Sequence, residues 1–262
     1  MLSFDKIVNK LLKKWWKVLL KSDIFELIDP ETKPCYQGRV DKYIYRLKIE
    51  WVIISIKSWV YVVPSEEDKT LNSIDLLEKY YVQLLKKYIT YYTWNQYFIS
   101  GKKALQFHMK DFSIPEKIYI TTRNLNKKIK IGNYEMIFKT VSGKIDTKQV
   151  NLYSRLSVFT QFKDIEGLSF KVSCLELALV ESALISDMHE WFDIGLLSKG
   201  IKKYAHVMDQ EVFYTLWTYK FSMSFNRLKE LSKPIAPELS KVFLDIIKKN
   251  GWLFIGEGLR WC

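Results

Sequence analysis

The hydrophobic positions near the start of the chain repeat with a helical period. From Phe4 to Leu20 they recur every three or four residues, opposite a row of lysines, which is typical of an amphipathic helix. A short second helix, with Ser22 or Asp23 as its N-cap, is expected to end before the proline-containing segment 29–34, which a helix does not tolerate. The pattern therefore predicts two helices before a turn.

A third helical repeat covers residues 36–50, and its polar side is rich in Arg and Lys. Its hydrophobic face consists of Val40, Tyr43, Ile44 and Leu47. Two β-rich runs follow at 52–56 and 60–63, joined by the short turn 57–59 and ended by Pro64. Helix, helix, turn, helix and hairpin is the element order of a winged helix-turn-helix.

The rest of the chain alternates between helical and β patterns. Two helices are expected at 74–89 and 102–109, and Gly132-Asn133 has the composition of a hairpin turn. Strands are expected at 117–122, 128–131, 134–141, 156–162 and 170–173. From Leu175 onward the periodicity is helical again.

A polar break after Pro64 indicates a domain boundary, which we place between residues 70 and 71. The predicted fold class is α+β. A winged helix-turn-helix over 1–70 is followed, over 71–262, by a mixed α/β domain with a small sheet and a helical C-terminal tail.

The charge of the chain favours a polyanionic partner. With 41 Lys and Arg against 29 Asp and Glu, the net charge is +12, which suits nucleic acid, an anionic membrane surface or solubility alone. The longest apolar run, 51–63, is interrupted by Lys57 and is shorter than the ~20 residues that span a bilayer. No secretory leader is readable at the start and only three cysteines are present, so we expect a cytoplasmic protein without a membrane partner.

Sequence patterns that would mark an enzyme or a cofactor site are missing. There is no C-x-x-C pair, no H-E-x-x-H, no phosphate-binding glycine loop and no G-x-S-x-G. Acids on helical segments could bind Mg²⁺, but they are most often solvated; here they are Glu176, Glu181, Asp187 and Asp193. The isolated histidines His108, His189 and His206 are interpreted as structural. We therefore expect no catalytic residue, no metal and no cofactor.

The basic third helix carries the candidate binding site. A helix of this length fits the major groove, where Arg, Lys and Gln side chains contact phosphates and base edges. The candidates are Tyr36, Gln37, Arg39, Lys42 and Arg46 on the helix, and Lys57 and Ser58 on the hairpin turn. The charges alone favour a surface helix that they merely keep soluble, but the order of the elements favours double-stranded DNA as the partner.

The remainder of the chain is basic as well. Residues 1–63 contain 12 Lys and Arg and seven Asp and Glu, which leaves +7 of the net charge to the other residues. A lysine-rich stretch at 79–94 could stack bases on its aromatic residues Tyr80, Tyr81, Tyr88, Tyr91, Tyr92 and Trp94. Aromatic stripes at helical spacing more often form core, so the sequence leaves a DNA, RNA or acidic protein contact open here.

Short stretches along the chain, in a consistent order, resemble one known family. In the first domain they are Tyr45-Arg46-Leu47, Trp51-Val52-Ile53 and the run 56–63. In the second domain they are 97–100 with Ala104, Leu105 and His108, then 114–122, 170–173 with Glu176, Ala178 and Leu179, and Asn226-Arg227-Leu228. These residues resemble the AbiEi-type antitoxins of type IV toxin-antitoxin systems.

The resemblance implies a regulator that performs no chemistry. Such an antitoxin is expected to repress its own operon through the winged helix, as two copies on an inverted repeat. It is expected to counter a nucleotidyltransferase-like toxin through the second domain without forming a stable complex. Two alternatives are a nucleotidyltransferase- or nuclease-like enzyme and a winged-helix module that binds proteins.

Two tryptophans depart from the family pattern. Glycine is usual after the recognition helix and in the wing turn, where this chain has Trp51 and Trp59, and Met109 likewise stands where glycine is expected. The chain has nine Trp and ten Gly, whereas average usage gives roughly 18 Gly. A bulky residue in left-handed backbone costs ~1 kcal/mol or more. We hypothesise that some of these tryptophans come from UGA codons that the source organism reads as glycine.

Overall fold

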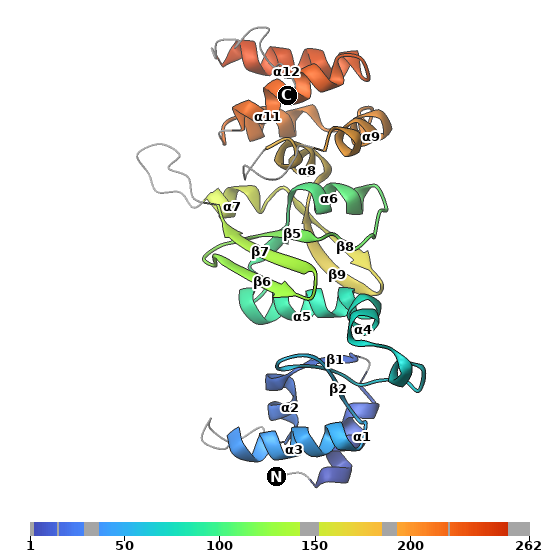
Figure 1. The fold of residues 1–262 in the computed structure, drawn as a ribbon. Coiled ribbons are helices and arrows are strands. Elements are labelled where there is room, and N and C mark those ends of the chain that lie inside the picture. The colour runs from blue at the N-terminus through green and yellow to red at the C-terminus, as the bar shows by residue number, and fades with distance from the viewer. Residues whose placement is uncertain are drawn as a thin grey trace. The chain divides into compact units, whose positions relative to one another are not determined.

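The computed structural model describes residues 3–14, 16–28, 37–141, 152–184, 193–219 and 221–250, without the side chains of Gln37 and Arg39. It confirms the α+β class and the helical C-terminal region (Figure 1). By contacts, unit 1 comprises Met1–Asn95, Ile129–Met136 and Asp164–Leu168, and unit 2 comprises Gln96–Lys128, Ile137–Lys163 and Ser169–Cys262. The domain boundary expected after residue 70 falls inside unit 1. Whether the segments on either side of it fold independently stays a prediction.

The first elements of unit 1 form the expected winged helix-turn-helix. In chain order they are α1 (Phe4–Leu12), β1 (Val18–Leu20), α2 (Lys21–Ile28), α3 (Gln37–Ile49), β2 (Ile54–Lys57) and β3 (Val60–Val62). Strand β3 lies between β1 and β2 and pairs antiparallel with both, so that Val62 is opposite Val18 on one side and Ile54 on the other. Helix α3 and the β2–β3 hairpin therefore follow the predicted order.

The prediction of one helix over residues 4–20 was wrong at its second half. Helix α1 ends at Leu12, and Val18–Leu20 form the buried strand β1. A strand that is buried on both faces shows no alternation, so its apolar residues mimic a continued helical stripe. The backbone N–H groups of Lys17 and Val18 donate to Oε1 of Gln83 at 3.0 and 3.4 Å, which helps to hold this strand in place.

The core of the winged helix is built from one apolar face of each helix. The buried residues at its centre are Ile7 and Leu11 of α1, Ile24 and Ile28 of α2, and Val40, Ile44 and Leu47 of α3, together with Tyr61 and Val63. Because the three α3 residues recur at steps of four and three, burying them turns the opposite side of α3 outward. The fold thus fixes which α3 side chains are exposed.

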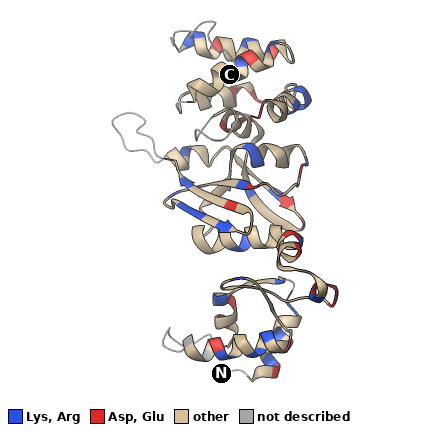
Figure 2. Cartoon of the chain, viewed as in Figure 1, with Lys and Arg blue, Asp and Glu red and all other residues tan. Residues whose placement is uncertain are grey.

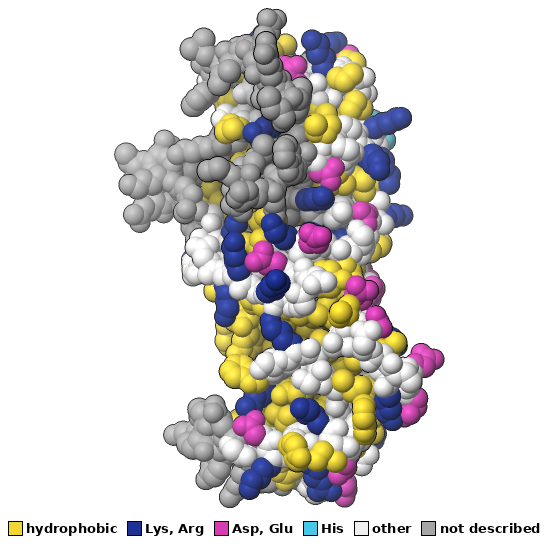
Figure 3. Space-filling view, in the orientation of Figure 1, with side chains coloured by type: hydrophobic (Ala, Val, Ile, Leu, Met, Phe, Trp, Pro, Cys, Tyr) yellow, Lys and Arg dark blue, Asp and Glu magenta, His cyan; other side chains and the backbone are white. Residues whose placement is uncertain are grey.

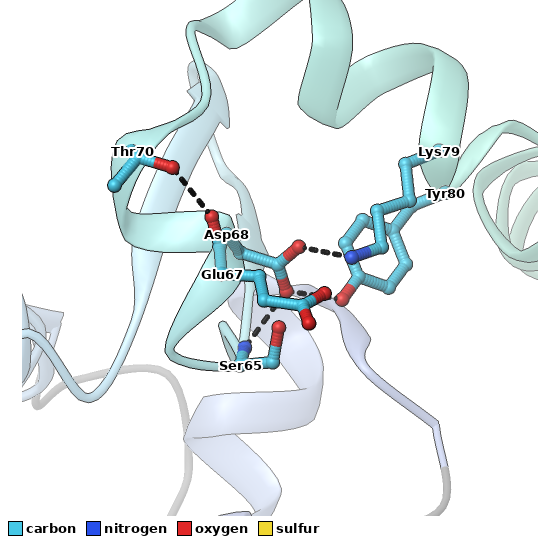
Figure 4. A network of polar contacts seen from close by, with 6 residues as sticks. All are labelled: Ser65, Glu67, Asp68, Thr70, Lys79 and Tyr80. Carbon is cyan, nitrogen blue, oxygen red and sulfur yellow. Dashed lines mark hydrogen bonds and ion pairs between the residues drawn. The ribbon is translucent and has the colours of Figure 1, made fainter.

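Unit 1 continues through η2 (Glu67–Thr70), α4 (Ser73–Lys79) and α5 (Tyr81–Thr93). Asp68 is fully buried and connects η2 to the end of α4 (Figure 4). Its carboxylate accepts hydrogen bonds from Lys79 Nζ at 2.6 Å, the Tyr80 hydroxyl at 2.5 Å and the Ser65 N–H at 2.7 Å. Burial alone would raise the pKa of Asp68, but the hydrogen bonds from Lys79 and Tyr80 outweigh it and hold this pKa well below its usual range.

A six-stranded sheet has the order β6-β7-β5-β4-β9-β8. The strands are β4 (Tyr97–Ile99), β5 (Lys117–Thr122), β6 (Lys127–Ile131), β7 (Tyr134–Thr140), β8 (Thr160–Ile165) and β9 (Leu168–Ser173). Strand β4 pairs antiparallel with β5 and parallel with β9. The hairpin turn Gly132-Asn133 is confirmed, and Gly132 supplies the positive φ of 59° that such a turn requires.

The remaining helices belong to unit 2: α6 (Gly101–His108), α7 (Leu152–Leu156), α8 (Leu175–Ser182), α9 (Ile194–Tyr204), α10 (Gln210–Trp217), α11 (Ser222–Ser232) and α12 (Pro237–Lys249). The strand expected at 156–162 was wrong at its start, since Leu156 ends α7. Phe213, Phe225 and Phe243 meet edge to face with ring centroids 5.0–6.3 Å apart, and they lie at the centre of a largely helical core. Among the described residues, no helix combines the length and the hydropathy that a bilayer-spanning segment needs.

Candidate nucleic-acid interface

The outward side of α3 is the surface on which the sequence placed its binding residues. Lys42, Arg46 and Lys48 are exposed there, while Val40 and Ile44 face the core. Figure 2 shows Lys and Arg positions along α3. Lysine and arginine on an exposed helix can neutralise DNA phosphates. The basic side of α3 is therefore exposed, as the sequence predicted.

The predicted α3 residues differ in how far the structure describes them. Tyr36 lies outside the described residues, and so do the side chains of Gln37 and Arg39. Arg46 is exposed but engaged: its Nε pairs with Glu50 Oε1 at 2.8 Å, and its guanidinium carbon lies 3.8 Å from the ring centroid of Phe4. Lys42 is exposed on the same helix.

Lys57 and Ser58 are both exposed at the turn between β2 and β3, as a wing contact would require. The register of the hairpin shifts between Ser55 and Lys57, so strand β2 contains an irregularity next to the turn. The Lys57 ammonium donates to the backbone carbonyl of Lys130. This hydrogen bond holds the Lys57 side chain against residue 130 of the same molecule. A DNA contact by Lys57 would have to replace or share this hydrogen bond.

Lys21 links α3 to the hairpin turn within the winged helix. Its ammonium pairs with Asp41 of α3 at 2.6 Å, and its backbone N–H donates to the carbonyl of Trp59 at 2.9 Å. The ammonium also lies 5.8 Å from the Trp59 ring centroid. A half-exposed ion pair contributes at most about 1 kcal/mol, so its main effect is to fix the position of the turn beside the start of α3.

The sequence analysis missed two exposed residues on α3. Tyr45 and Ile49 are 67% and 58% exposed, and they lie opposite the buried face. Their position follows from the 100° step of a helix measured from Val40 and Leu47, but they were not included among the candidate binding residues. The exposed surface of α3 is therefore mixed apolar and basic.

Other groups singled out by the sequence have structural roles in unit 2. Glu181 accepts hydrogen bonds from the Gly101 N–H at 2.9 Å and the Ser173 hydroxyl at 2.7 Å, and burial raises its pKa to about 7. Glu176 is buried and accepts from the Asp209 N–H at 2.9 Å. Asp193 caps α9 and pairs with Lys102.

These contacts correct the expectation that the acids on helical segments are solvated, at least for Glu176 and Glu181. Asp187 and His189 lie outside the described residues. Within the described ranges, no group of three or more His, Cys, Asp and Glu side chains could hold a metal ion.

His108 is buried, and its Nε2 lies 2.8 Å from the Ser173 carbonyl. Burial lowers the pKa of His108, which favours the neutral imidazole. Buried Lys103 donates to the carbonyls of Asp111 and Ser113 in the loop after α6, and burial lowers its pKa to about 8. Both side chains satisfy backbone groups, as structural residues do.

Three of the six aromatic residues in the stretch 79–94 belong to the core. Tyr80, Tyr81 and Tyr88 are buried, whereas Tyr91 and Trp94 are exposed. Lys79 and Tyr80 bind Asp68 (Figure 4), so they are engaged within unit 1. The arrangement favours the core interpretation over a base-stacking surface.

No protein-family model matches the chain, and no curated protein matches it. Among solved structures, the chain is similar to the crystal structure of the RV2827C protein from Mycobacterium tuberculosis. The TM-score is 0.55 at 12% sequence identity, and the match covers 92% of this chain and 80% of that chain. A likeness at this identity shows the fold alone.

Proposed function

We propose that this chain is a double-stranded DNA-binding transcriptional regulator that inserts α3 into the major groove and places the β2–β3 turn against the backbone. The proposal extends to its biology: the chain acts as an AbiEi-like antitoxin, binds an inverted repeat upstream of its own operon as two copies, and counters a nucleotidyltransferase-like toxin without a stable complex. The protein performs no catalysis in this role.

One observation carries the DNA-binding proposal: α3 buries Val40, Ile44 and Leu47 and turns Lys42, Arg46 and Lys48 outward. A helix with this division, set beside an antiparallel hairpin, has the element order and the charge that groove-binding winged helices use. The net charge of +12 adds a long-range attraction for a polyanion.

The test is a binding titration with the duplex immediately upstream of the gene, measured over a range of salt concentrations. Removing one phosphate-binding charge lowers the salt slope by about 1 and the affinity on the order of tenfold near 0.1 M salt. We expect this effect for Lys42→Ala. Lys202→Ala is the matched control, because it removes the same charge from an exposed position on α9.

Equal affinities and slopes for the two variants would contradict the α3 assignment. The antitoxin part of the proposal has a separate test in cells. We expect this chain to restore growth when it is co-expressed with a nucleotidyltransferase-like protein encoded next to it. A growth arrest that this chain does not relieve would contradict the antitoxin role.

A further inference from the structure

The second half of the exposed face of α3 carries an apolar strip, Tyr45 and Ile49, with basic residues around it. Tyr45 and Ile49 are 67% and 58% exposed and lie four residues apart, so they are neighbours on the helix surface. Lys42 precedes them on the same face, and Arg46 and Lys48 lie to either side. Figure 3 shows hydrophobic and basic side chains interleaved over this helix.

Gly38 continues this line of residues toward the start of α3. A Cβ built there meets no described atom within 4 Å, so packing against the described residues does not require glycine at this position. Gly38 is the second residue of α3, so it leaves the backbone of the first turn bare. A bare backbone on an outward face is useful where a partner approaches closely.

The charge of the surroundings restricts what that partner can be. An apolar strip between cationic margins fits a surface with anionic edges and apolar groups between them. The major groove has this arrangement, because phosphates line its edges and the C5-methyl group of thymine projects into it. From residue 38 to residue 49 the helix rises about 16 Å, which is about five base-pair steps of 3.4 Å.

We infer that Tyr45 and Ile49 contact thymine C5-methyl groups, so that the DNA site of this chain has thymines where the second half of α3 lies in the major groove. The inference rests on the proposed function and specifies its ligand. It also explains why two large apolar side chains remain exposed on a helix whose other outward residues are mostly charged.

The experiment uses the full chain and begins with selection from a pool of random DNA duplexes. The selected duplex is then compared with versions in which single thymines are replaced by uracil, which removes only the C5-methyl group. Burying one methyl group corresponds to about fourfold in affinity. We expect a loss of about this size at one or more positions of each half-site.

Variants locate the contact on the protein. In Ile49→Ala, the uracil substitution that Ile49 senses should no longer change the affinity. Ile74→Ala is the matched control, because Ile74 of α4 is 57% exposed and lies outside the winged helix. This variant should keep the full uracil effect. Because both isoleucines are exposed, neither substitution should change the melting temperature of the protein appreciably.

Each other outcome contradicts the inference in a recognisable way. Tight, salt-dependent binding that is insensitive to uracil at every position would overturn the thymine contact and leave the proposed function intact. Failure to select any duplex would overturn both. If Ile49→Ala instead dissociates a dimer in sedimentation and leaves the uracil effect unchanged, the apolar strip is an interface between two copies of this chain.

Discussion

Trp51, Trp59 and Trp94 adopt the left-handed backbone conformation, with φ angles of 56°, 68° and 50°. Their side chains are 56%, 67% and 86% exposed, so packing does little to offset the strain. Trp51 lies just after α3 in a Schellman motif. Its N–H donates to the carbonyl of Lys48, and the N–H of Val52 donates to the carbonyl of Leu47. This position strongly favours glycine.

Replacing each of these tryptophans by glycine should raise the free energy of unfolding by about 1 kcal/mol, because glycine adopts positive φ without the steric cost. Denaturant unfolding measures the change. Tyr91→Gly is the control with the opposite sign: Tyr91 is an exposed aromatic residue inside α5, where glycine should destabilise the protein by about 1 kcal/mol. Destabilisation by all three Trp→Gly changes would contradict the strain argument.

The same angles sharpen the codon hypothesis. They add Trp94 to Trp51 and Trp59, whereas Met109 has an ordinary φ of −81° and the left-handed residue after α6 is Lys110. If the source organism reads UGA as glycine, these three tryptophans should correspond to UGA codons, and mass spectrometry of the natural protein should find glycine there. UGG codons at all three positions would end the hypothesis.

Glu181 makes stability depend on pH at the scale of a single residue. Its pKa is raised to about 7 by burial, above the value of about 4.3 in an unfolded chain. A raised acid pKa gives stability that is present below about pH 4.3 and is lost as the pH rises through 7. The loss should be on the order of 2–3 kcal/mol between pH 5 and pH 8.

Glu181→Gln should remove this part of the pH dependence, because an amide oxygen can accept from Gly101 and Ser173 as the carboxylate does. Urea unfolding at pH 5 and pH 8 measures it in both proteins. An unchanged difference between the two pH values in the variant would assign the pH dependence to other groups.

At the scale of elements, the Asp68 network connects η2 to the end of α4. Asp68→Ala removes the acceptor for Lys79 and for the buried Tyr80 hydroxyl, so it should destabilise the protein by about 2–4 kcal/mol. Glu66→Gln is the control, since it breaks only the exposed pair with Lys69 and should cost less than about 0.5 kcal/mol. Thermal unfolding of the two variants should separate them clearly, and similar melting temperatures would mean that the network contributes little.

The elements also show how much of the fold could be predicted. Helix α3 was predictable because Val40, Ile44 and Leu47 repeat with the helical period, and the β2–β3 hairpin because β-branched residues flank a short turn. Strands β1 and β4 were missed because each has three residues, all buried, and a run that short carries no period. Their identity depends on pairing with β3 and β5, which is a tertiary property.

The charged residues of the candidate site were predicted from the sequence, whereas its exposed apolar residues, Tyr45 and Ile49, were not. Lys42, Lys57 and Ser58 are exposed on the elements where the sequence placed them. Tyr45 and Ile49 lie off the predicted hydrophobic face of α3, so their exposure followed from the helical period. They were left out because the site residues were chosen for polar contacts with DNA. The internal pairing of Arg46 with Glu50 was available from their four-residue spacing.

At the scale of the whole molecule, the net charge of +12 is shared between the winged-helix segment, with +5 over residues 1–63, and the rest of the chain. If DNA is bound by α3 and the β2–β3 turn alone, four or five cations contact phosphates and log K falls with log salt at a slope of about −4 per chain. Two chains on an inverted repeat would then give about −8 in total.

Replacing Lys128 tests whether the positive charge outside the winged helix contributes to DNA binding. Lys128 is exposed on β6 in unit 2 and carries the same charge as Lys42. We expect Lys128→Ala to leave the salt slope unchanged, measured as fluorescence anisotropy between 50 and 200 mM salt, because the proposed DNA contacts all lie on α3 and the β2–β3 turn. A slope reduced by about 1 per chain would mean that the DNA footprint extends beyond the winged helix, and the positive charge outside it would then serve binding as well as solubility.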